Sequence, residues 1–448
     1  MTALYGALQR GLPTSEIPAS ARPLLDANGI TCGYLAGISM NENTLLTSWN
    51  PSRATLDLRR PSCGSSGLYY KNEQQRMLFS SSLPQLLTIQ SGPLKLEPDS
   101  LIDSLIFGRV LPPYTLYRGI HCLAAGQELQ LALDGKVIGQ QLRQAWDWAS
   151  TVLAYLENEN TQDMADQAPE PIGRRLVLQY EPEFAANPAS GEAEILTVDA
   201  AGVFDAIPAT VNASGQPLGD LIESTLLSAV SALRAEAPLH CDLATELLLA
   251  LPHAKPALTA PEFLASSRLR RLITSWRELR EPLLWQPVKQ VAQRSKTRLN
   301  PDILFRLCHI LPERRLALAT LATSQQLPLH FVCADTPRLA RRIANVLRGA
   351  PPTPLSETNP RRPLLLQYQR FPDIDEGYTN PYQRAVILSH QTDQLGIDDV
   401  NRFFHLQAWP MHKYRRLSRQ PVGALLEQRL CSILSTQYLL NFASPVAN

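Results

Sequence analysis

The chain is poor in glycine and in charge of either sign. It has 22 glycines in 448 residues and a net charge of +1, and 19% of its residues are charged, where soluble proteins average roughly 25%. A protein that binds nucleic acid through bulk charge needs a marked basic excess, so this class is excluded. Scarce glycine beside 36 prolines favours X-Pro loop boundaries over glycine-built loops that cradle phosphate.

Other absences narrow the class of protein further. No run of 18 or more apolar residues occurs, and Met1–Tyr5 lacks the charged and apolar regions of a signal peptide, so we expect a soluble, cytoplasmic protein. The hydrophobic content of 44% can form a core, which excludes disorder throughout. No C-x-x-C occurs, and scattered cysteines predict buried, reduced thiols instead of disulfides or a zinc cluster. These cysteines are Cys32, Cys63, Cys122, Cys241, Cys308, Cys333 and Cys431.

Residues 1–135 are predicted to form mainly strands and turns. Short β-prone runs occur at 33–39 and 45–49, and two apolar runs flank a predicted hairpin at 71–76. Asp99 precedes an apolar stripe at helical spacing, so a helix is expected to begin there.

The rest of the chain divides into two parts of different sequence pattern, 136–215 and 216–448. Residues 136–215 are predicted to be a linker and irregular segment, because their acidic part is nearly free of large apolar residues. Residues 216–448 are mostly helical by periodicity, and a strand at 327–333 followed by a helical pattern is typical of an α/β domain. Helices are predicted at 218–233, 267–279, 303–321 (divided at Pro312), 338–347 and 422–440.

Two sets of residues in the first half match a known family. The run T-L-Y-R-G-I-x-x-L-x-x-G occupies Thr115–Gly126, and Gly67–Tyr70 and Leu78–Leu87 precede it in the matching order. Residues 33–135 thereby resemble the amino-terminal domain of glutamine-hydrolysing asparagine synthetases, a family that includes β-lactam synthetases and lasso-peptide cyclases. The resemblance implies an α/β protein: an α+β N-terminal-nucleophile amidotransferase-like sandwich (1–135, truncated), then a helix-rich adenine-nucleotide α-hydrolase-like, ATP-pyrophosphatase-like domain (216–448).

The family's glutaminase site is expected to be lost. Its nucleophile is a cysteine exposed after methionine removal, and this chain has Thr2 there, either a hydroxyl nucleophile or an ordinary second residue. The stretch that should hold the glutamine-binding arginine and the Asn-Gly motif is missing before Arg59. The family's Arg-Asp-x-x-Gly segment reads Arg60-Pro61-Ser62-Cys63-Gly64, without the aspartate.

The ATP site implied by the resemblance is expected to be degenerate. The family's S-G-G-x-D-S loop should follow a strand near 238–241, where this chain reads Asp242-Leu243-Ala244-Thr245-Glu246 without glycine. Glu246 places negative charge where a pyrophosphate should bind. Asp242, together with Asp335 after the next strand, is the candidate remnant of the ATP and Mg²⁺ site. Asp335 has a second interpretation as a helix N-cap before Pro337.

Further charged groups have two interpretations each. The acidic run Asp373–Glu376 could hold a cation or be solvated, and His240 could be a ligand or an ordinary strand-end residue. Three basic sets could bind phosphate or an acidic peptide, or form solvated helix faces. These sets are Arg268, Arg270, Arg271, Arg277 and Arg280; Lys289, Arg294, Lys296 and Arg298; and His412, Lys413, Arg415, Arg416 and Arg419.

The resemblance and these departures lead to one functional hypothesis and one alternative. The chain is expected to be an asparagine-synthetase-like pseudoenzyme of ATP-dependent amide-bond formation, in asparagine or peptide natural-product biosynthesis. It would lack glutaminase activity, resident metal and working catalytic residues, and would act with a partner enzyme or precursor peptide, not with nucleic acid or a membrane. The alternative is an active, divergent amide ligase or lasso-type peptide cyclase that uses ATP and Mg²⁺.

Overall fold

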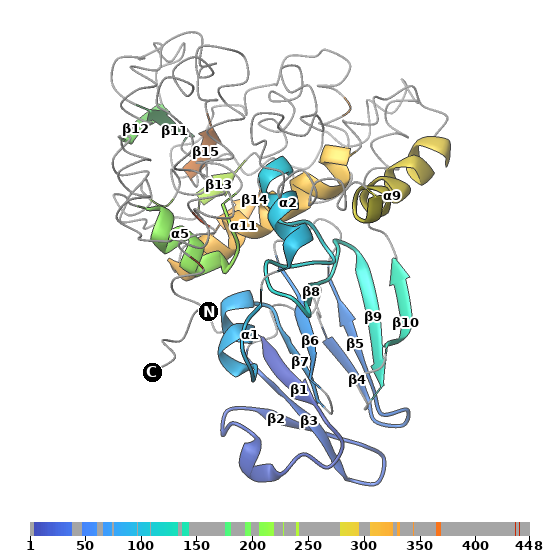
Figure 1. Cartoon of the computed structure of the whole chain (residues 1–448). Helices are drawn as coiled ribbons and strands as arrows, with labels where there is room; N and C mark the ends of the chain where they lie inside the picture. Colours follow the sequence, from blue (N-terminus) through green and yellow to red (C-terminus); the bar gives the residue numbers. More distant parts are fainter. Residues whose placement is uncertain are drawn as a thin grey trace, which may run out of the picture.

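The computed structural model of the chain contains three β-sheets with helices around them (Figure 1). It describes residues 4–37, 47–60, 66–73, 76–95, 97–107, 109–132, 137–142, 175–180, 193–198, 206–218, 239–241, 278–294, 305–325, 329–331 and 364–368, with single positions 227, 344, 435 and 439. No helix in these parts of the chain is both long enough and apolar enough to cross a membrane.

Two antiparallel sheets form the amino-terminal part. The first has the order β2 (Arg22–Leu25), β3 (Thr31–Ala36), β1 (Tyr5–Leu8), β7 (Arg76–Ser80), β6 (Tyr69–Glu73) and β8 (Ile120–Cys122). The second has the order β10 (Val137–Leu142), β9 (Gln127–Ala132), β5 (Thr55–Arg59) and β4 (Thr47–Asn50).

A single apolar cluster joins these two sheets. Leu8 and Phe79 come from the first sheet and Leu56 and Leu131 from the second, and each is at most 1% exposed. Alternating strand residues supply such a core because successive side chains point to opposite faces. The sheets therefore pack as a sandwich. The full cluster is Leu8, Leu24, Leu56, Leu58, Leu68, Met77, Phe79, Leu123, Leu129 and Leu131.

The predicted hairpin is confirmed, with longer strands than the apolar runs suggested. Strands β6 and β7 pair antiparallel from Tyr69 opposite Ser80 to Glu73 opposite Arg76. The polar residues at the end of the hairpin belong to the strands because Glu73 binds both Lys71 (2.9 Å) and Arg76 (3.2 Å). The hydrogen bonds from these cations and from Ser91 lower the pKa of Glu73, against the effect of its burial.

The third sheet is entirely parallel and draws on distant parts of the sequence. Its order is β12 (Ala193–Val198), β11 (Arg175–Tyr180), β15 (Leu364–Tyr368), β13 (Leu239–Cys241) and β14 (Leu329–Phe331). Strand β14 lies within the strand predicted at 327–333. The expectation of an irregular segment at 136–215 fails at β10, β11 and β12, because each short strand is stabilised by a neighbour that local patterning does not reveal.

The described helices are α1 (Leu83–Ile89), α2 (Pro98–Phe107), α5 (Ile207–Ser214), α9 (Glu281–Arg294) and α11 (Leu311–Ser324), with short helical turns at Thr14–Glu16 and Arg306–Ile310. The helix expected to open at Asp99 is confirmed as α2. The division expected at Pro312 is also confirmed: a π-helical turn ends at Ile310, and Pro312 occupies the first turn of α11. Figure 1 shows α11 between the sandwich and the parallel sheet.

The T-L-Y-R-G-I run folds into a tight turn that leads into β8. The buried hydroxyl of Thr115 lies 3.0 Å from the carbonyl oxygen of Ile120 and accepts a 3.1 Å hydrogen bond from the Tyr117 N–H. Ser100 of α2 donates to the Thr115 carbonyl oxygen. Gly119 has φ +77°, a conformation that residues with a Cβ rarely adopt. The motif therefore holds α2, the turn and β8 together.

Replacing Thr115 with valine should destabilise the fold. The change keeps the shape but leaves the Tyr117 N–H buried without its acceptor, which costs about 1–3 kcal/mol of unfolding free energy. Thr88→Val is the matched control, because Thr88 is exposed on α1 and its hydroxyl bonds only to the neighbouring Gln85 carbonyl. Urea unfolding of both variants measures the difference, and equal losses would contradict the role of Thr115.

The partly buried His309 makes stability depend on pH. Burial lowers its pKa to about 4, and its ring Nε2 lies 3.0 Å from the Leu284 carbonyl oxygen of α9. Because the folded pKa lies below the usual value near 6.5, the unfolded state binds the proton first. The stabilisation is present above pH 6.5 and is lost as the pH falls towards 4.

We therefore expect His309→Gln to flatten the decrease in unfolding free energy between pH 6.5 and 4. The flattening should be on the order of 2–3 kcal/mol across this window. Urea unfolding at half-unit pH steps measures it. Parallel curves for the parent and the variant would show that His309 does not titrate in this way.

Candidate functional site

The residues predicted to be remnants of an ATP site lie outside the described part of the chain. Asp242 follows Cys241, the last residue of β13, and Asp335 comes four positions after Phe331, the last residue of β14. Strands β13 and β14 are parallel neighbours, with Cys241 opposite Phe331. Their carboxyl ends thus meet at one edge of the sheet, which is where α/β sheets commonly bind ligands. Thr2, Asp373–Glu376 and the His412–Arg419 set also lie outside the described residues.

A buried arginine connects the sandwich to helix α11. Arg60, at the end of β5, is fully buried, and its Nη1 donates to Glu313 Oε1 (2.7 Å) and to the Leu123 carbonyl oxygen (2.8 Å). The same nitrogen lies 3.6 Å from the sulfur of Cys122. Its Nε and Nη2 have no hydrogen-bond partner among the described residues. The carboxylate of Glu313 is therefore the main compensation for this charge.

The pKa of Arg60 follows from this arrangement. Burial alone lowers the pKa of the guanidinium, but the Glu313 carboxylate more than offsets the burial, so the pKa is raised and the group stays charged. Glu313 lies in the first turn of α11, where the helix dipole also favours a negative charge. The pair thus holds opposite charges on two elements that are 253 residues apart in the sequence.

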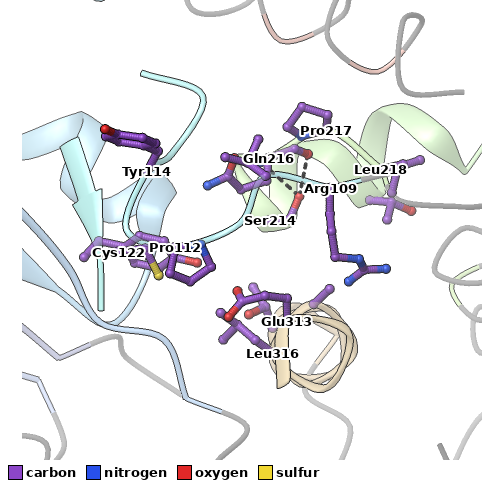
Figure 2. Close-up of a pocket in the computed structure, with 15 residues that line it drawn as sticks. Arg109, Pro112, Tyr114, Cys122, Ser214, Gln216, Pro217, Leu218, Glu313 and Leu316 are labelled. Carbon is purple, nitrogen blue, oxygen red and sulfur yellow. Dashed lines mark hydrogen bonds between the residues drawn. The ribbon is translucent and has the colours of Figure 1, made fainter. Parts of the chain in front are cut away.

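A cavity lies beside this pair, between the sandwich, α5 and α11. Its volume, including the open mouth, is about 620 Å³. Figure 2 shows side chains from all three walls around a common space. The sandwich side contributes Tyr69, Arg109, Val110, Pro112, Tyr114 and Cys122; the α5 side contributes Thr210, Ser214, Gln216, Pro217 and Leu218; and α11 contributes Glu313, Leu316, Ala317 and Thr320.

Two titratable groups of the cavity wall, Cys122 and Tyr69, are shifted towards their neutral forms. Burial raises the pKa of the Cys122 thiol to about 12, although Arg60 acts in the opposite direction. Burial also raises the pKa of the Tyr69 hydroxyl well above its usual value. Both groups are therefore protonated at neutral pH. The cavity offers hydrogen-bond donors but no thiolate nucleophile.

A second buried ion pair corrects one prediction about the basic residues. Arg280 is 1% exposed, and its Nη2 lies 2.8 Å from Asp103 Oδ2 of α2. The same nitrogen donates to the carbonyl oxygens of Leu111 (2.6 Å) and Pro112 (3.1 Å), and the guanidinium lies 4.4 Å from the centre of the Tyr114 ring. Arg280 thus fixes α9 to α2 and does not belong to an exposed phosphate-binding face.

Few sequence features predict this site. Arg60 lies in the segment that resembles Arg-Asp-x-x-Gly, but its partner Glu313 follows a proline in a helical stretch, a usual place for an acidic residue. Tyr69 and Gln216 carry no motif that marks a binding site. One sequence signal was available: Arg60 continues the alternation of Leu56 and Leu58, which places it on the same face as these leucines, and a buried arginine needs a partner.

No family model matches the chain, and no curated protein matches it. The resemblance to asparagine synthetases therefore rests on the residues named above. Among the described residues, no group of three or more histidine, cysteine, aspartate or glutamate side chains could hold a metal ion.

Removing the charge of Glu313 should be strongly destabilising. Glu313→Gln leaves the Arg60 guanidinium buried without a counter-charge, and breaking a buried pair in this way costs about 3–5 kcal/mol. Glu97→Gln is the control, because the Glu97–Arg118 pair is longer (3.8 Å) and the Arg118 side chain is 60% exposed, a setting worth about 0–1 kcal/mol. Chemical unfolding gives both values, and a loss below about 1 kcal/mol at Glu313 would refute the dependence of Arg60 on it.

Proposed function

We propose that the chain is an asparagine-synthetase-like protein that acts as a non-catalytic partner in ATP-dependent amide-bond formation. The product would be asparagine or a peptide natural product, and the partner would be a biosynthetic enzyme or a precursor peptide. The proposal is supported by an antiparallel sandwich followed along the chain by strands of a parallel sheet. It is the arrangement that the resemblance implies for an amidotransferase-like domain and a nucleotide-binding domain.

The observation that carries the proposal is the structural use of the family-like residues. Arg60 donates hydrogen bonds to Glu313 and to the Leu123 carbonyl oxygen, and Thr115 and Gly119 form the turn before β8. None of these three contacts requires a substrate. A chain that has lost glutaminase activity would still need these residues to fold the sandwich and to attach it to α11.

The described cysteines also support a domain without glutaminase activity. Burial raises the pKa of Cys32, and more strongly those of Cys122 and Cys308. A thiol attacks an amide only as the thiolate, which needs an exposed, electropositive setting. These three thiols are therefore structural groups.

The sequence after β13 supports a degenerate nucleotide site. A phosphate-binding loop needs small residues so that backbone N–H groups can approach the phosphate oxygens. The chain continues from Cys241 with Asp242-Leu243-Ala244-Thr245-Glu246, which supplies two carboxylates and no glycine. Both carboxylates would repel a triphosphate. Adenylation of a carboxylic acid is therefore not expected.

ATP–pyrophosphate exchange tests this proposal. The purified chain should show no exchange above background with Mg²⁺ and aspartate, and no ammonia release from glutamine, while a glutamine-hydrolysing asparagine synthetase assayed in parallel shows both. Exchange with aspartate or with a peptide carboxylate would overturn the non-catalytic assignment and favour the active ligase. In that case, Mg-ATP titration of the Lys289→Glu and Arg294→Glu variants would show whether this basic set holds the nucleotide.

A further inference from the structure

Several polar groups around the cavity between the sandwich, α5 and α11 are already satisfied inside the protein. The Thr210 hydroxyl donates to the Ala206 carbonyl oxygen (2.7 Å), and the Ser214 hydroxyl lies 3.0 Å from the carbonyl oxygen of Gln216. The sulfur of Cys122 contacts Arg60 and the Leu123 carbonyl oxygen. Arg109, 7% exposed, also has interactions within the protein. These groups require nothing from a ligand.

Three polar groups from different walls of the cavity still lack a partner among the described residues. The Tyr69 hydroxyl, the second carboxylate oxygen of Glu313 and the side-chain amide nitrogen of Gln216 have no hydrogen-bond partner within the described part of the chain. They come from three walls: β6, α11 and the segment after α5 (Figure 2 shows Gln216 and Glu313). Tyr69 is only 6% exposed and the Glu313 side chain 10%. Bulk water therefore reaches these two groups poorly.

These three groups specify the head group of a ligand. The Gln216 nitrogen needs an acceptor, the Glu313 oxygen needs a donor, and the Tyr69 hydroxyl donates because its pKa is raised by burial. A cationic donor is disfavoured, since Arg60 already neutralises Glu313 at 2.7 Å. An anionic head would face the Glu313 oxygen. A neutral group that both donates and accepts satisfies all three.

The remaining lining determines the body of the ligand. Val110, Pro112, Leu316 and Ala317 are apolar and line the same cavity. A pocket with mainly apolar walls and a few converging polar atoms is the usual form of a small-molecule site. A short hydrocarbon chain would cover these side chains while its head group reaches Tyr69 and Glu313.

We propose that this cavity binds a small molecule with a primary carboxamide on a short apolar chain. The carboxamide N–H groups donate to Glu313, and its carbonyl oxygen accepts from Gln216 and Tyr69. The proposal does not depend on the proposed function, because it uses no nucleotide and neither Asp242 nor Asp335. Ordered water in place of the carboxamide is the competing occupant.

Ligand-observed NMR with butyramide tests the proposal on the full chain. Butyramide should give a saturable signal with a Kd on the order of millimolar, as its few non-hydrogen atoms allow. Butyrate and butylammonium have the same chain length with a charged head, and each should bind at least about fivefold more weakly. No saturable butyramide signal, or equal binding of the three compounds, would refute the carboxamide assignment.

Two variants connect the binding to the named atoms. Tyr69→Phe removes only the hydroxyl, and Gln216→Glu replaces the donor nitrogen by oxygen while keeping the acceptor for the Leu116 N–H. Each variant should bind butyramide at least fivefold more weakly than the parent chain. The melting temperature of each variant checks that it folds. Tyr70→Phe is the control, since the adjacent residue on β6 packs against the sandwich core and the His121 ring. Unchanged binding in whichever of the two variants folds would show that these atoms do not hold butyramide and would refute the proposal.

Discussion

The described structure depends on one buried charge, the guanidinium of Arg60. A fully buried cation is tolerated only with a counter-charge, and among the described residues Glu313 is the carboxylate that contacts Arg60. Glu313 of α11 supplies it, so the end of β5 and the first turn of α11 must stay together. Gly67 adds a steric condition, because a Cβ there would lie 3.1 Å from Leu316 of the same helix. The cavity exists because these two contacts fix its opposite walls.

The buried Arg280–Asp103 pair attaches α9 to the amino-terminal part, as the Arg60–Glu313 pair attaches α11. Asp103 and Arg280 link α2 to the residue before α9, and Arg280 also binds two carbonyl oxygens of the segment before Tyr114. Both pairs join the amino-terminal part to helices far along the chain. Each is costly to break, because loss of one partner leaves the other charge buried. The amino-terminal part and these helices therefore behave as one structural unit.

The residues that resemble the family's motifs have structural roles in the proposed pseudoenzyme, not catalytic ones. In the proposed pseudoenzyme, T-L-Y-R-G-I is a turn held by the Thr115 hydroxyl and by the positive φ of Gly119. Arg60 links β5 to α11, and burial keeps the thiols of Cys122 and Cys308 protonated. A scaffold can keep such residues for stability after losing its chemistry. A partner or a small ligand would then use the surfaces and the cavity that this scaffold maintains.

Local patterning by itself determined the β6–β7 hairpin, α2, β14 and the division at Pro312, because alternation, helical spacing and proline geometry act within a few residues. It did not reveal β11 and β12, since short strands depend on neighbours such as β15, nearly 200 residues away. It placed Arg280 in a basic set that either binds phosphate or an acidic peptide or forms a solvated helix face, and only the packing of α2 showed its partner. The cavity and the Arg60–Glu313 pair were likewise decided by tertiary structure, because burial and charge pairing arise only when distant segments meet.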